Sequence, residues 1–354
     1  MRFQETEYSN FAEALRGKAG RERIPFEGAI EITHRCNLSC KHCYCCLGAS
    51  DSAARRDELS LCKIISVIDD VERRGCLFLL ITGGEPLLRK DFADIYAHAK
   101  KKGLLVTVFT NATLVDDETL QLFKRLPPYR VEVTLYGITG KTYESVTGVK
   151  GSFDMCMAGI KALRGAVRNL TIKTMAITLN SHEIPQMKAF AKSVGADFRF
   201  DPLIQSRMDG SRVPRDFRLS PEEAARFDIT DGDRCNGWKE FAKKAGPVRE
   251  PELLFLCGAG RTSFFIDPYG RMSVCSMCAG YSSGLKERSF DDIWDIDFAK
   301  VLDKRYNEYR CGNCDAAVYC DQCAGWGMTE NNDPESVVEY LCSLARERKK
   351  LLGH

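Results

Sequence analysis

The sequence has no long apolar segment and no excess of charge of one sign. Its longest uninterrupted apolar run, Cys76 to Ile81, is far too short to cross a bilayer. The first residues, MRFQETEYSN, lack the apolar stretch of a secretory signal. Lysine and arginine number 51 against 49 acidic residues, a net charge of +2, so no basic surface for nucleic acid or membranes is indicated. We therefore expect a cytoplasmic protein that binds neither nucleic acid nor a membrane.

Size and composition are those of a globular protein, except for cysteine. The 354 residues are 44% hydrophobic and 28% charged, enough for one large and one smaller domain, and no short repeat suggests a solenoid. Cysteine occurs 17 times. Because the cytosol keeps thiols reduced, a disulfide framework is not expected. The thiols indicate either soft-metal ligation or small buried hydrophobes, and their spacing has to decide.

Short apolar runs alternate with amphipathic stretches between Gly28 and Pro202. This alternation predicts parallel βα units. The predicted strands are 29–33, 77–82, 104–110, 130–135, 171–178 and 198–202. The predicted helices are 59–74, 91–102, 116–125, 153–164 and 183–193.

The pattern changes after Pro202. Residues 204–217 are rich in Arg, Asp, Gly, Ser and Pro, which is typical of a linker. Further on, a hairpin is predicted at 262–275, turning on Pro268-Tyr269-Gly270, and a closing helix at 335–351. We therefore divide the chain into an N-terminal extension (1–25), an α/β domain (26–203), a bridging region (204–245) and a cysteine-rich domain (246–354).

The first cysteine motif follows the first predicted strand. Cys36, Cys40 and Cys43 are separated by three and two residues. Three thiolates at this spacing can bind three irons of a 4Fe–4S cube and leave the fourth iron open to a chelating ligand. With His34 or His42 as a fourth ligand, the same thiols would form a closed zinc site. Spacing alone does not decide between the iron–sulfur cluster and the zinc site.

The second predicted strand ends in Gly83-Gly84-Glu85-Pro86, at the edge where barrel enzymes build their active sites. Two glycines let the backbone approach a ligand closely, and a carbonyl or carboxylate can receive an ammonium group. Together the two motifs resemble the radical S-adenosylmethionine (SAM) superfamily. Its first loop carries CxxxCxΦC, where Φ is usually aromatic and here is His42, and its second strand ends in GGE.

This resemblance implies a partial (β/α)6 barrel of the TIM type. It makes Cys36, Cys40 and Cys43 ligands of a 4Fe–4S cluster whose open iron binds SAM. One electron from the cluster then cleaves SAM to methionine and a 5′-deoxyadenosyl radical, which abstracts hydrogen from a substrate.

The resemblance also implies cofactor contacts at several strand ends. Gly83, Gly84 and Glu85 would meet the methionine end of SAM, and His42 would lie near the adenine. Weaker matches are Thr110, Asn111, Thr134 and Asn180, any of which can equally be an ordinary turn residue. Many relatives have Asp-Gly after the fourth strand, where this chain has Tyr136-Gly137, so ribose contacts there are in question.

The C-terminal third carries a second cysteine pattern. It reads C-x12-G-x4-C, then C-x2-C-x5-C-x2-C, then a final C, at Cys257, Gly270, Cys275, Cys311, Cys314, Cys320, Cys323 and Cys342. This resembles the SPASM extension of radical enzymes, with one departure: the family has three residues, not two, before the cysteine here numbered 323.

The SPASM resemblance implies two auxiliary iron–sulfur clusters, expected to be 4Fe–4S. The outer one would be held by Cys311, Cys314, Cys320 and Cys342. The inner one would be held by Cys257, Cys275 and Cys323. Its fourth position would be an open iron or a ligand from elsewhere, for which Cys278 is the nearest candidate. A zinc ribbon is the alternative for these thiols.

The remaining cysteines have no partner at ligand spacing, so we expect buried packing for Cys45, Cys46, Cys62, Cys76, Cys156 and Cys235. Substrate-side candidates lie in the charged segment after the sixth strand, at Asp201, Arg207, Asp209 and Arg212, although such a segment is usually just solvated.

The layout most resembles the maturase of pyrroloquinoline quinone synthesis and its thioether-forming relatives. The expected function is therefore radical modification of a ribosomally made peptide. Alternatives are a sulfatase-type formylglycine maturase, a tetrapyrrole-modifying enzyme of haem biosynthesis, and a zinc-stabilised binding module. Expected partners are a precursor peptide and an electron donor such as flavodoxin or ferredoxin. Because fewer than thirty residues precede the first strand, a separate leader-recognition protein is also expected.

Overall fold

The structure is a computed structural model that describes residues 8–45, 47–245 and 253–353. Cys46 and the predicted domain boundary at residue 246 lie outside these ranges. Within them, nine strands form one sheet in the order β11-β10-β9-β1-β4-β5-β6-β7-β8, and two short strands pair beside it, β2 (Arg35–Cys36) and β3 (Leu47–Gly48).

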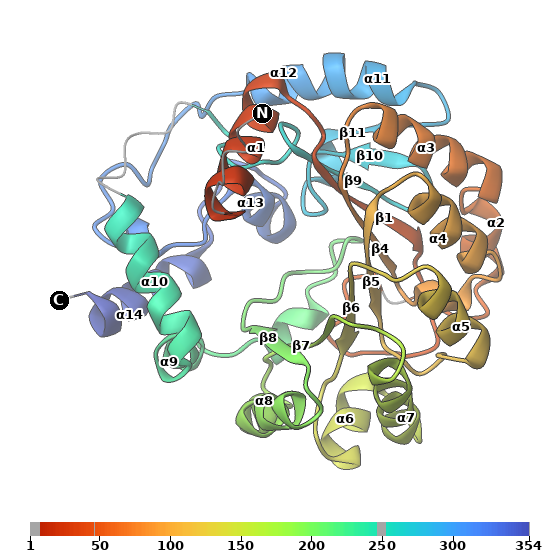
Figure 1. The fold of residues 1–354 in the computed structure, drawn as a ribbon. Helices are drawn as coiled ribbons and strands as arrows, with labels where there is room; N and C mark the ends of the chain where they lie inside the picture. Colours follow the sequence, from red (N-terminus) through yellow and green to blue (C-terminus); the bar gives the residue numbers. More distant parts are fainter. Residues whose placement is uncertain (1–7, 46, 246–252, 354) are drawn as a thin grey trace, which may run out of the picture.

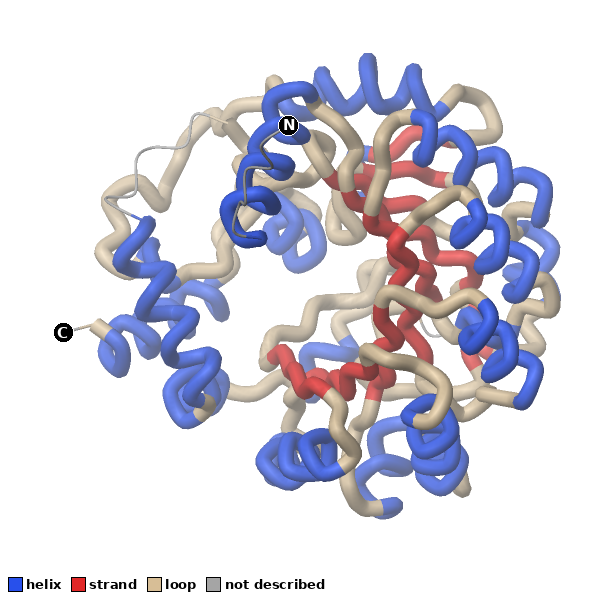
Figure 2. The backbone as a smooth tube through the Cα atoms, in the orientation of Figure 1, coloured by secondary structure: helices blue, strands red, loops and turns tan. Residues whose placement is uncertain are grey.

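Six parallel strands form the curved wall of a partial barrel, which confirms the predicted fold class. They are β1 (Glu27–Thr33), β4 (Phe78–Gly83), β5 (Leu105–Thr110), β6 (Arg130–Thr134), β7 (Leu170–Met175) and β8 (Asp197–Asp201). The helices that connect them lie on the outer side of the curved sheet (Figures 1 and 2). These are α2 (Ser52–Asp57), α3 (Leu61–Arg73), α4 (Phe92–Lys101), α5 (Asp117–Arg125), α6 (Gly140–Thr147), α7 (Ser152–Arg164) and α8 (Ile184–Ser193).

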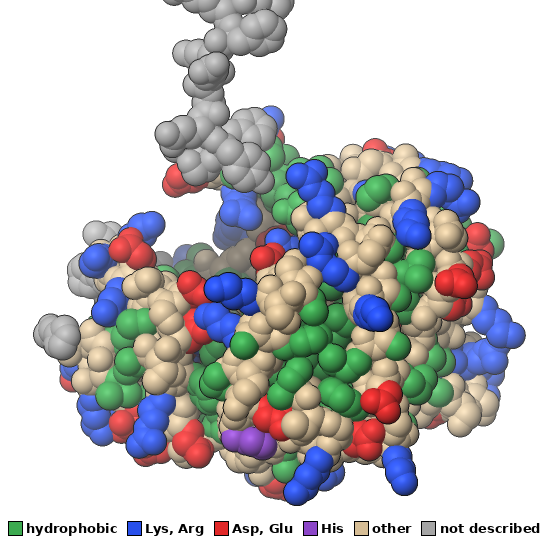
Figure 3. All heavy atoms as spheres, turned by 60° about the horizontal axis from the view of Figure 1, so that its bottom comes forward, with side chains coloured by type: hydrophobic (Ala, Val, Ile, Leu, Met, Phe, Trp, Pro, Cys, Tyr) green, Lys and Arg blue, Asp and Glu red, His purple; other side chains and the backbone are tan. Residues whose placement is uncertain are grey.

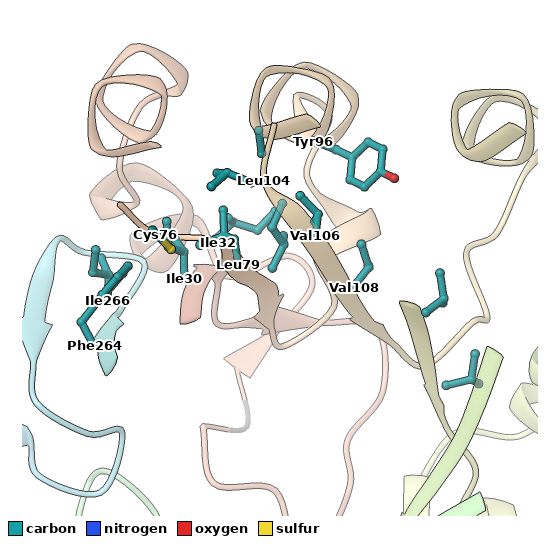
Figure 4. Packing of buried hydrophobic residues seen from close by; sticks show 14 of the residues in the cluster. Ile30, Ile32, Cys76, Leu79, Tyr96, Leu104, Val106, Val108, Phe264 and Ile266 are labelled. Carbon is teal, nitrogen blue, oxygen red and sulfur yellow. The ribbon is translucent and has the colours of Figure 1, made fainter. Parts of the chain in front are cut away.

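The core lies between the sheet and these helices. Alternate residues of each strand point into it, for example Ile30 and Ile32 of β1 and Val106 and Val108 of β5, all at most 2% exposed (Figure 4). The other face of each strand therefore points into the barrel. Because that inner face carries Glu31, Glu132 and Lys173 where a packed core would have apolar side chains, the barrel interior is a polar site.

The predicted hairpin is confirmed, and it extends the barrel sheet. β9 (Ser263–Ile266) pairs with β10 (Arg271–Ser273) in antiparallel fashion, and Gly270 in the turn has a φ of +87°. β9 also pairs in parallel with β1, and β11 (Ser282–Gly284) completes the edge. The hairpin thus carries the cysteine-rich region to the strand that leads into the first cysteine loop.

The remaining helices lie around the C-terminal third (Figure 1). They are α1 (Tyr8–Glu22), α9 (Pro221–Thr230), α10 (Gly232–Ala245), α11 (Phe290–Asp292), α12 (Phe298–Leu302), α13 (Ala324–Asn331) and α14 (Glu339–Leu352). The closing helix begins at Glu339 and not at 335, because Asn332 turns the chain at a φ of +55° and Pro334 follows. The bridging region, predicted as linker, contains helices α9 and α10.

None of the described helices is both long and apolar enough to span a membrane. On the face drawn in Figure 3, basic and acidic side chains are interspersed, in keeping with the balanced net charge.

Candidate functional site

The end of β4 lies directly against the start of the first cysteine loop. The backbone N–H of Gly84 donates to the Thr33 carbonyl at 2.7 Å, and that of Glu85 donates to the Arg35 carbonyl at 2.9 Å. A Cβ at Gly84 would lie 2.4 Å from the Arg35 oxygen, and one at Gly83 would lie 2.1 Å from the Thr33 oxygen. Only glycine permits this approach, so the two motifs identified in the sequence form one site.

The Glu85 carboxylate is fully buried and joins three segments. It accepts hydrogen bonds from the Thr110 hydroxyl (2.8 Å) and from the backbone N–H groups of Asn111 (2.7 Å) and Leu87 (3.1 Å). Burial raises its pKa to about 7, although these donors and the Lys173 ammonium oppose the shift. Glu85 therefore fixes the ends of β4 and β5 to each other.

The thiols of the first loop converge beneath these strand ends. Cys36 accepts from the Leu38 N–H at 3.4 Å and from the Asn111 amide at 3.7 Å, and burial raises its pKa to about 12. Cys36, Cys40 and Cys43 are all close enough to influence the pKa of Tyr136. Cys40 and Cys43 belong to one turn, in which the Cys43 N–H donates to the Cys40 carbonyl at 3.0 Å. N–H donors to sulfur, as at Cys36, suit a thiolate that binds iron, and ligation by the three thiols stays a prediction.

Two rings cover the loop. His42 is buried, and its ring meets that of Tyr136 edge-on with 4.7 Å between the centroids. Burial lowers the pKa of His42 to about 4, so the imidazole is neutral, and its buried Nδ1 has no hydrogen-bond partner in the structure. An unsatisfied nitrogen beside the thiols fits a bound cofactor. Tyr136, noted in the sequence only as a departure from Asp, proves to be part of the site.

A buried carboxylate of β1 anchors the end of the loop. Glu31 accepts from the Tyr44 hydroxyl and lies 2.6 Å from His34 Nε2. The Tyr44 carbonyl in turn accepts from the N–H of Met208 at 3.0 Å, which brings the 204–217 segment to the cysteine loop. Sequence reasoning missed Glu31 and Tyr44; the signal was a Glu within an otherwise apolar strand.

Charged side chains of three neighbouring strands meet inside the barrel. Arg199 donates to Glu132 (Nε to Oε2, 3.0 Å), whose Oε2 also lies 4.0 Å from the Lys173 ammonium. Lys173 lies over the Phe109 ring, and burial holds its pKa well below the usual value. Two basic side chains thus share one carboxylate, and a further anionic group placed beside them would favour the protonated form of Lys173 and be received there.

The other predicted site residues differ in surroundings. Thr134 is level with Lys173 in the β6–β7 register. Asn180 is fully buried. Its side-chain amide stabilises the local turn, because it accepts a hydrogen bond from the Ile177 N–H and donates one to the Met175 carbonyl. Asp201 ends β8 and accepts from the Leu203 N–H at 2.8 Å. Their contacts with a cofactor or substrate remain predictions.

Of the three candidates in the linker, Arg207 and Asp209 flank Met208, whose N–H bonds to the Tyr44 carbonyl of the cysteine loop, and Arg207 is the less exposed of these two. Its buried Nε has no partner in the structure. Asp209 and Arg212 are exposed, and Asp209 caps its own turn by accepting from the Ser211 N–H at 2.9 Å. A substrate-side role is therefore better supported for Arg207 than for the other two.

The thiols of the C-terminal third lie in two sets. The first set is Cys311, Cys314, Cys320 and Cys342. Burial raises the pKa of Cys311, Cys320 and Cys342, and a neighbouring thiol of the same set raises each of the three further. Cys257, Cys275, Cys278 and Cys323 form the second set. These sets coincide with the crossed wiring implied by the SPASM resemblance; ligation itself remains a prediction.

The remaining thiols are more varied than expected. Cys76 and Cys156 are buried and Cys62 is exposed. Cys45 Sγ lies 3.8 Å from Cys43 Sγ, so this thiol, for which we expect only buried packing, is next to a predicted ligand. Among the described residues, no three Cys, His, Asp or Glu side chains form a group that could hold a single metal ion.

A cavity of about 970 Å³ lies elsewhere, at the amino-terminal ends of β6 to β8. Arg130, Thr171 and Asp197 line it together with Lys188 and Asp231. It is at the opposite edge of the sheet from the cysteine loop.

Comparison with known families gives two matches. The radical SAM superfamily matches residues 30–191, and an iron–sulfur cluster-binding domain, SPASM, matches residues 257–324. The matched ranges contain the first cysteine loop with GGE, and every C-terminal cysteine discussed above except Cys342.

Similar proteins belong to two functional groups. The chain is 25% identical to an AdoMet-dependent heme synthase of Methanosarcina barkeri (86% of this chain, 93% of the relative) and 36% identical to the Fe-coproporphyrin III synthase of that organism (74% and 72%). It is 28% identical to the mycofactocin maturase MftC of Mycolicibacterium smegmatis (90% and 85%). Among solved structures, SuiB of Streptococcus suis bound to S-adenosylmethionine has the same fold, with a TM-score of 0.72 at 16% identity over 96% of this chain and 83% of SuiB.

Proposed function

Since this chain belongs to the radical SAM superfamily and carries a SPASM domain, we propose that it modifies a ribosomally made peptide by hydrogen abstraction. The chain is an enzyme, as its family and its maturase relative indicate. The modification would be a carbon–carbon or thioether crosslink or another oxidation.

One observation carries the proposal: the GGE segment is hydrogen-bonded to the residues that precede Cys36. An open iron at Cys36, Cys40 and Cys43 would thereby face the strand end that receives an amino group. A ligand that chelates iron through an amino and a carboxylate group, as SAM does, would be held between the two.

The residues fit such a cofactor. When bound, the cluster and SAM supply a 5′-deoxyadenosyl radical. Cys36, Cys40 and Cys43 would hold the iron, and the backbone of Gly83 and Gly84 gives room for the methionine end. His42 and Tyr136 would exclude water and face the adenine. The two sets of thiols in the C-terminal third would hold two auxiliary clusters, which we propose to be 4Fe–4S.

The peptide substrate is supported by the likeness to MftC over 90% of the chain. A second candidate is an iron-bearing tetrapyrrole, which the 36% identity to Fe-coproporphyrin III synthase favours. The interior cations Lys173 and Arg199 suit a substrate that carries a carboxylate. Both a peptide and a propionate-bearing macrocycle meet that requirement, so the choice rests on experiment.

The proposal includes partners and a compartment. A flavodoxin or ferredoxin would supply the electron, and a separate small protein would recognise the leader of the peptide. The many thiols suit the reducing cytoplasm.

Binding of the leader peptide can be measured with the purified chain alone and with the candidate helper protein added. Tight, leader-specific binding without any helper would contradict the proposal of a separate leader-recognition protein.

The SAM-cleaving site is tested with Cys40→Ala. Purified without oxygen, the variant should lose the first cluster, keep the iron of the C-terminal third and form no 5′-deoxyadenosine after dithionite reduction. Cys62→Ala, at an exposed position on α3, is the matched control and should behave like the wild type. Undiminished 5′-deoxyadenosine from Cys40→Ala would refute the assignment.

The substrate class is tested by offering two probes to the reduced enzyme. One is the set of short peptides encoded next to its gene, and the other is iron-coproporphyrin III. We expect a peptide to gain a mass shift together with 5′-deoxyadenosine. A modified porphyrin with unchanged peptides would establish the second candidate instead.

A further inference from the structure

Cys278 occupies a position unlike that of the other buried cysteines. It is 1% exposed, and its backbone N–H donates to the Cys275 carbonyl at 3.0 Å, so residues 275–278 form a tight turn. The turn places both thiols on one side, in hydrogen-bond contact with each other. Cys76 and Cys156, by contrast, donate to the backbone carbonyls of Phe78 (3.4 Å) and Thr134 (4.0 Å).

The turn packs against the segment that carries Cys323. A Cβ at Gly325 would lie 2.9 Å from Cβ of Met277 and 3.6 Å from both the Met277 sulfur and Cys323 Sγ. The Cys323 thiol therefore lies beside the 275–278 turn. A larger residue at position 325 would push the 275–278 turn away from the segment that carries Cys323, so the close contact requires glycine.

Cys257 completes the group. The segment that follows Cys257 packs on the hairpin just before the 275–278 turn, because a Cβ at Gly260 would lie 2.7 Å from Cγ1 of Val274. The residues that follow Cys257 offer no substitute thiolate: a Cβ at Gly258 would lie 2.7 Å from the Thr262 hydroxyl and 3.7 Å from that of Ser263. Four thiols thus lie around this place in the described residues, and the neutral Met277 thioether, a weaker ligand than a thiolate, lies beside them.

We propose that Cys278 is the fourth ligand of the inner auxiliary cluster, together with Cys257, Cys275 and Cys323. This inference rests on the proposed function, because it presupposes iron in the C-terminal third. Four thiolates satisfy every iron of a 4Fe–4S cube. The inner cluster then has no iron free to coordinate a substrate thiolate, and substrate must be held by protein groups such as those of the barrel interior.

The experiment uses the full chain with Cys36, Cys40 and Cys43 changed to Ala, so that only auxiliary iron remains. In this parent we compare Cys278→Ala and Cys278→Ser with Cys76→Ala, which removes a buried thiol that no cluster is expected to need. Iron content, Mössbauer spectra and electron paramagnetic resonance after ferricyanide oxidation are recorded. Cyanide and a thiol-bearing peptide are then added to the parent.

We expect the parent to be unaffected by cyanide or thiol. Both Cys278 variants should lose about one to four irons per chain or show a three-iron signal on oxidation, while Cys76→Ala matches the parent. Unchanged iron and spectra in Cys278→Ala would overturn the inference. So would a cyanide-shifted inner cluster in the parent, a readout that holds even if the Cys278 variants fail to fold. A parent that binds zinc in place of iron would overturn the auxiliary-cluster part of the proposed function as well.

Discussion

Arg348 and Asp228 form a buried ion pair between α14 and α9, 120 residues apart in the chain. Arg348 Nε donates to Asp228 Oδ2 at 2.6 Å, and the two side chains are 1% and 0% exposed. The same guanidinium also binds the carboxylate of Asp321, next to Cys320, and stacks on Trp238 of α10 at 4.2 Å. The outer thiol set is therefore tied to the bridging helices through one arginine.

Arg348→Met should destabilise the C-terminal third. It leaves the buried Asp228 carboxylate with Arg234 alone, and breaking such a pair costs about 3 kcal/mol. We expect a lower thermal midpoint and partial loss of auxiliary iron, with the first cluster retained. The neighbouring Lys349→Met is the control, because its pair with Asp315 is exposed and screened by solvent. Equal effects of the two substitutions would show that Arg348 has no such role.

Much of the barrel could be predicted from the sequence. All six strands and five of the seven connecting helices were predicted within a few residues, because buried parallel strands and amphipathic helices have distinct apolar patterns; the short helices α2 and α6 were missed. The helices of the bridging region were the main omission. No element was predicted between residues 218 and 245, yet Ser220 and Glu223 form a capping box at the start of α9, with Pro221 at the first helical position. That S-P-E-E signature was available in the sequence.

The residues of the site likewise divide into those that could be predicted from the sequence and those that could not. Cys36, Cys40, Cys43 and GGE could be found because their spacing is local. Glu31, Lys173 and Arg199 could not, since their roles depend on which strands become neighbours and on which face each side chain lies. A single charged residue within an apolar strand, such as Glu31, indicates a buried polar position but does not identify its partners, so the long-range side-chain networks had to come from the structure.

Gly84→Ala should disturb the junction between β4 and the cysteine loop. The added methyl group would meet the Arg35 and His34 carbonyl oxygens at 2.4 and 2.6 Å, and neither can yield without moving the backbone. We expect a loss of about 1–3 kcal/mol in stability and weakened SAM binding, measured by thermal unfolding and equilibrium dialysis. At Gly48 a Cβ meets nothing within 4 Å, so Gly48→Ala should be close to neutral. Normal SAM affinity in Gly84→Ala would contradict the close approach.

Tyr44→Phe should loosen the anchor of the first loop while leaving its ligands in place. The change removes one donor from the buried Glu31 carboxylate, which keeps His34, and should cost about 1–3 kcal/mol. Thermal unfolding measures the loss, and full iron content would show that ligation is intact. Tyr129→Phe, at a 37% exposed ring, is the control. If both variants unfold at the wild-type temperature, the Tyr44–Glu31 bond does not stabilise the loop.

The buried Glu85 carboxyl should make stability depend on pH. Its pKa of about 7 in the folded chain lies above the ordinary value of 4.5, because burial disfavours the charged form. The folded state then binds the proton more tightly than the unfolded state does. The contribution of Glu85 to the free energy of unfolding is fully present at pH values below its ordinary pKa. It is lost as the pH rises through the folded-state pKa of about 7, by up to about 3 kcal/mol.

Glu85→Gln isolates this contribution, because glutamine keeps the size of the side chain but cannot ionise. Denaturant unfolding of the metal-free chain at pH 5 and pH 8 measures the loss for each protein. The wild type should lose more stability than the variant over this interval, and the excess is what Glu85 contributes. Lys173, Cys36 and Cys156 are titratable groups that interact with Glu85. Because the Lys173 ammonium favours the charged carboxylate, Lys173→Met should raise the pKa of Glu85 further and move the loss to higher pH. Identical losses in wild type and Glu85→Gln would mean that the carboxyl is ionised throughout, held by its three hydrogen-bond donors.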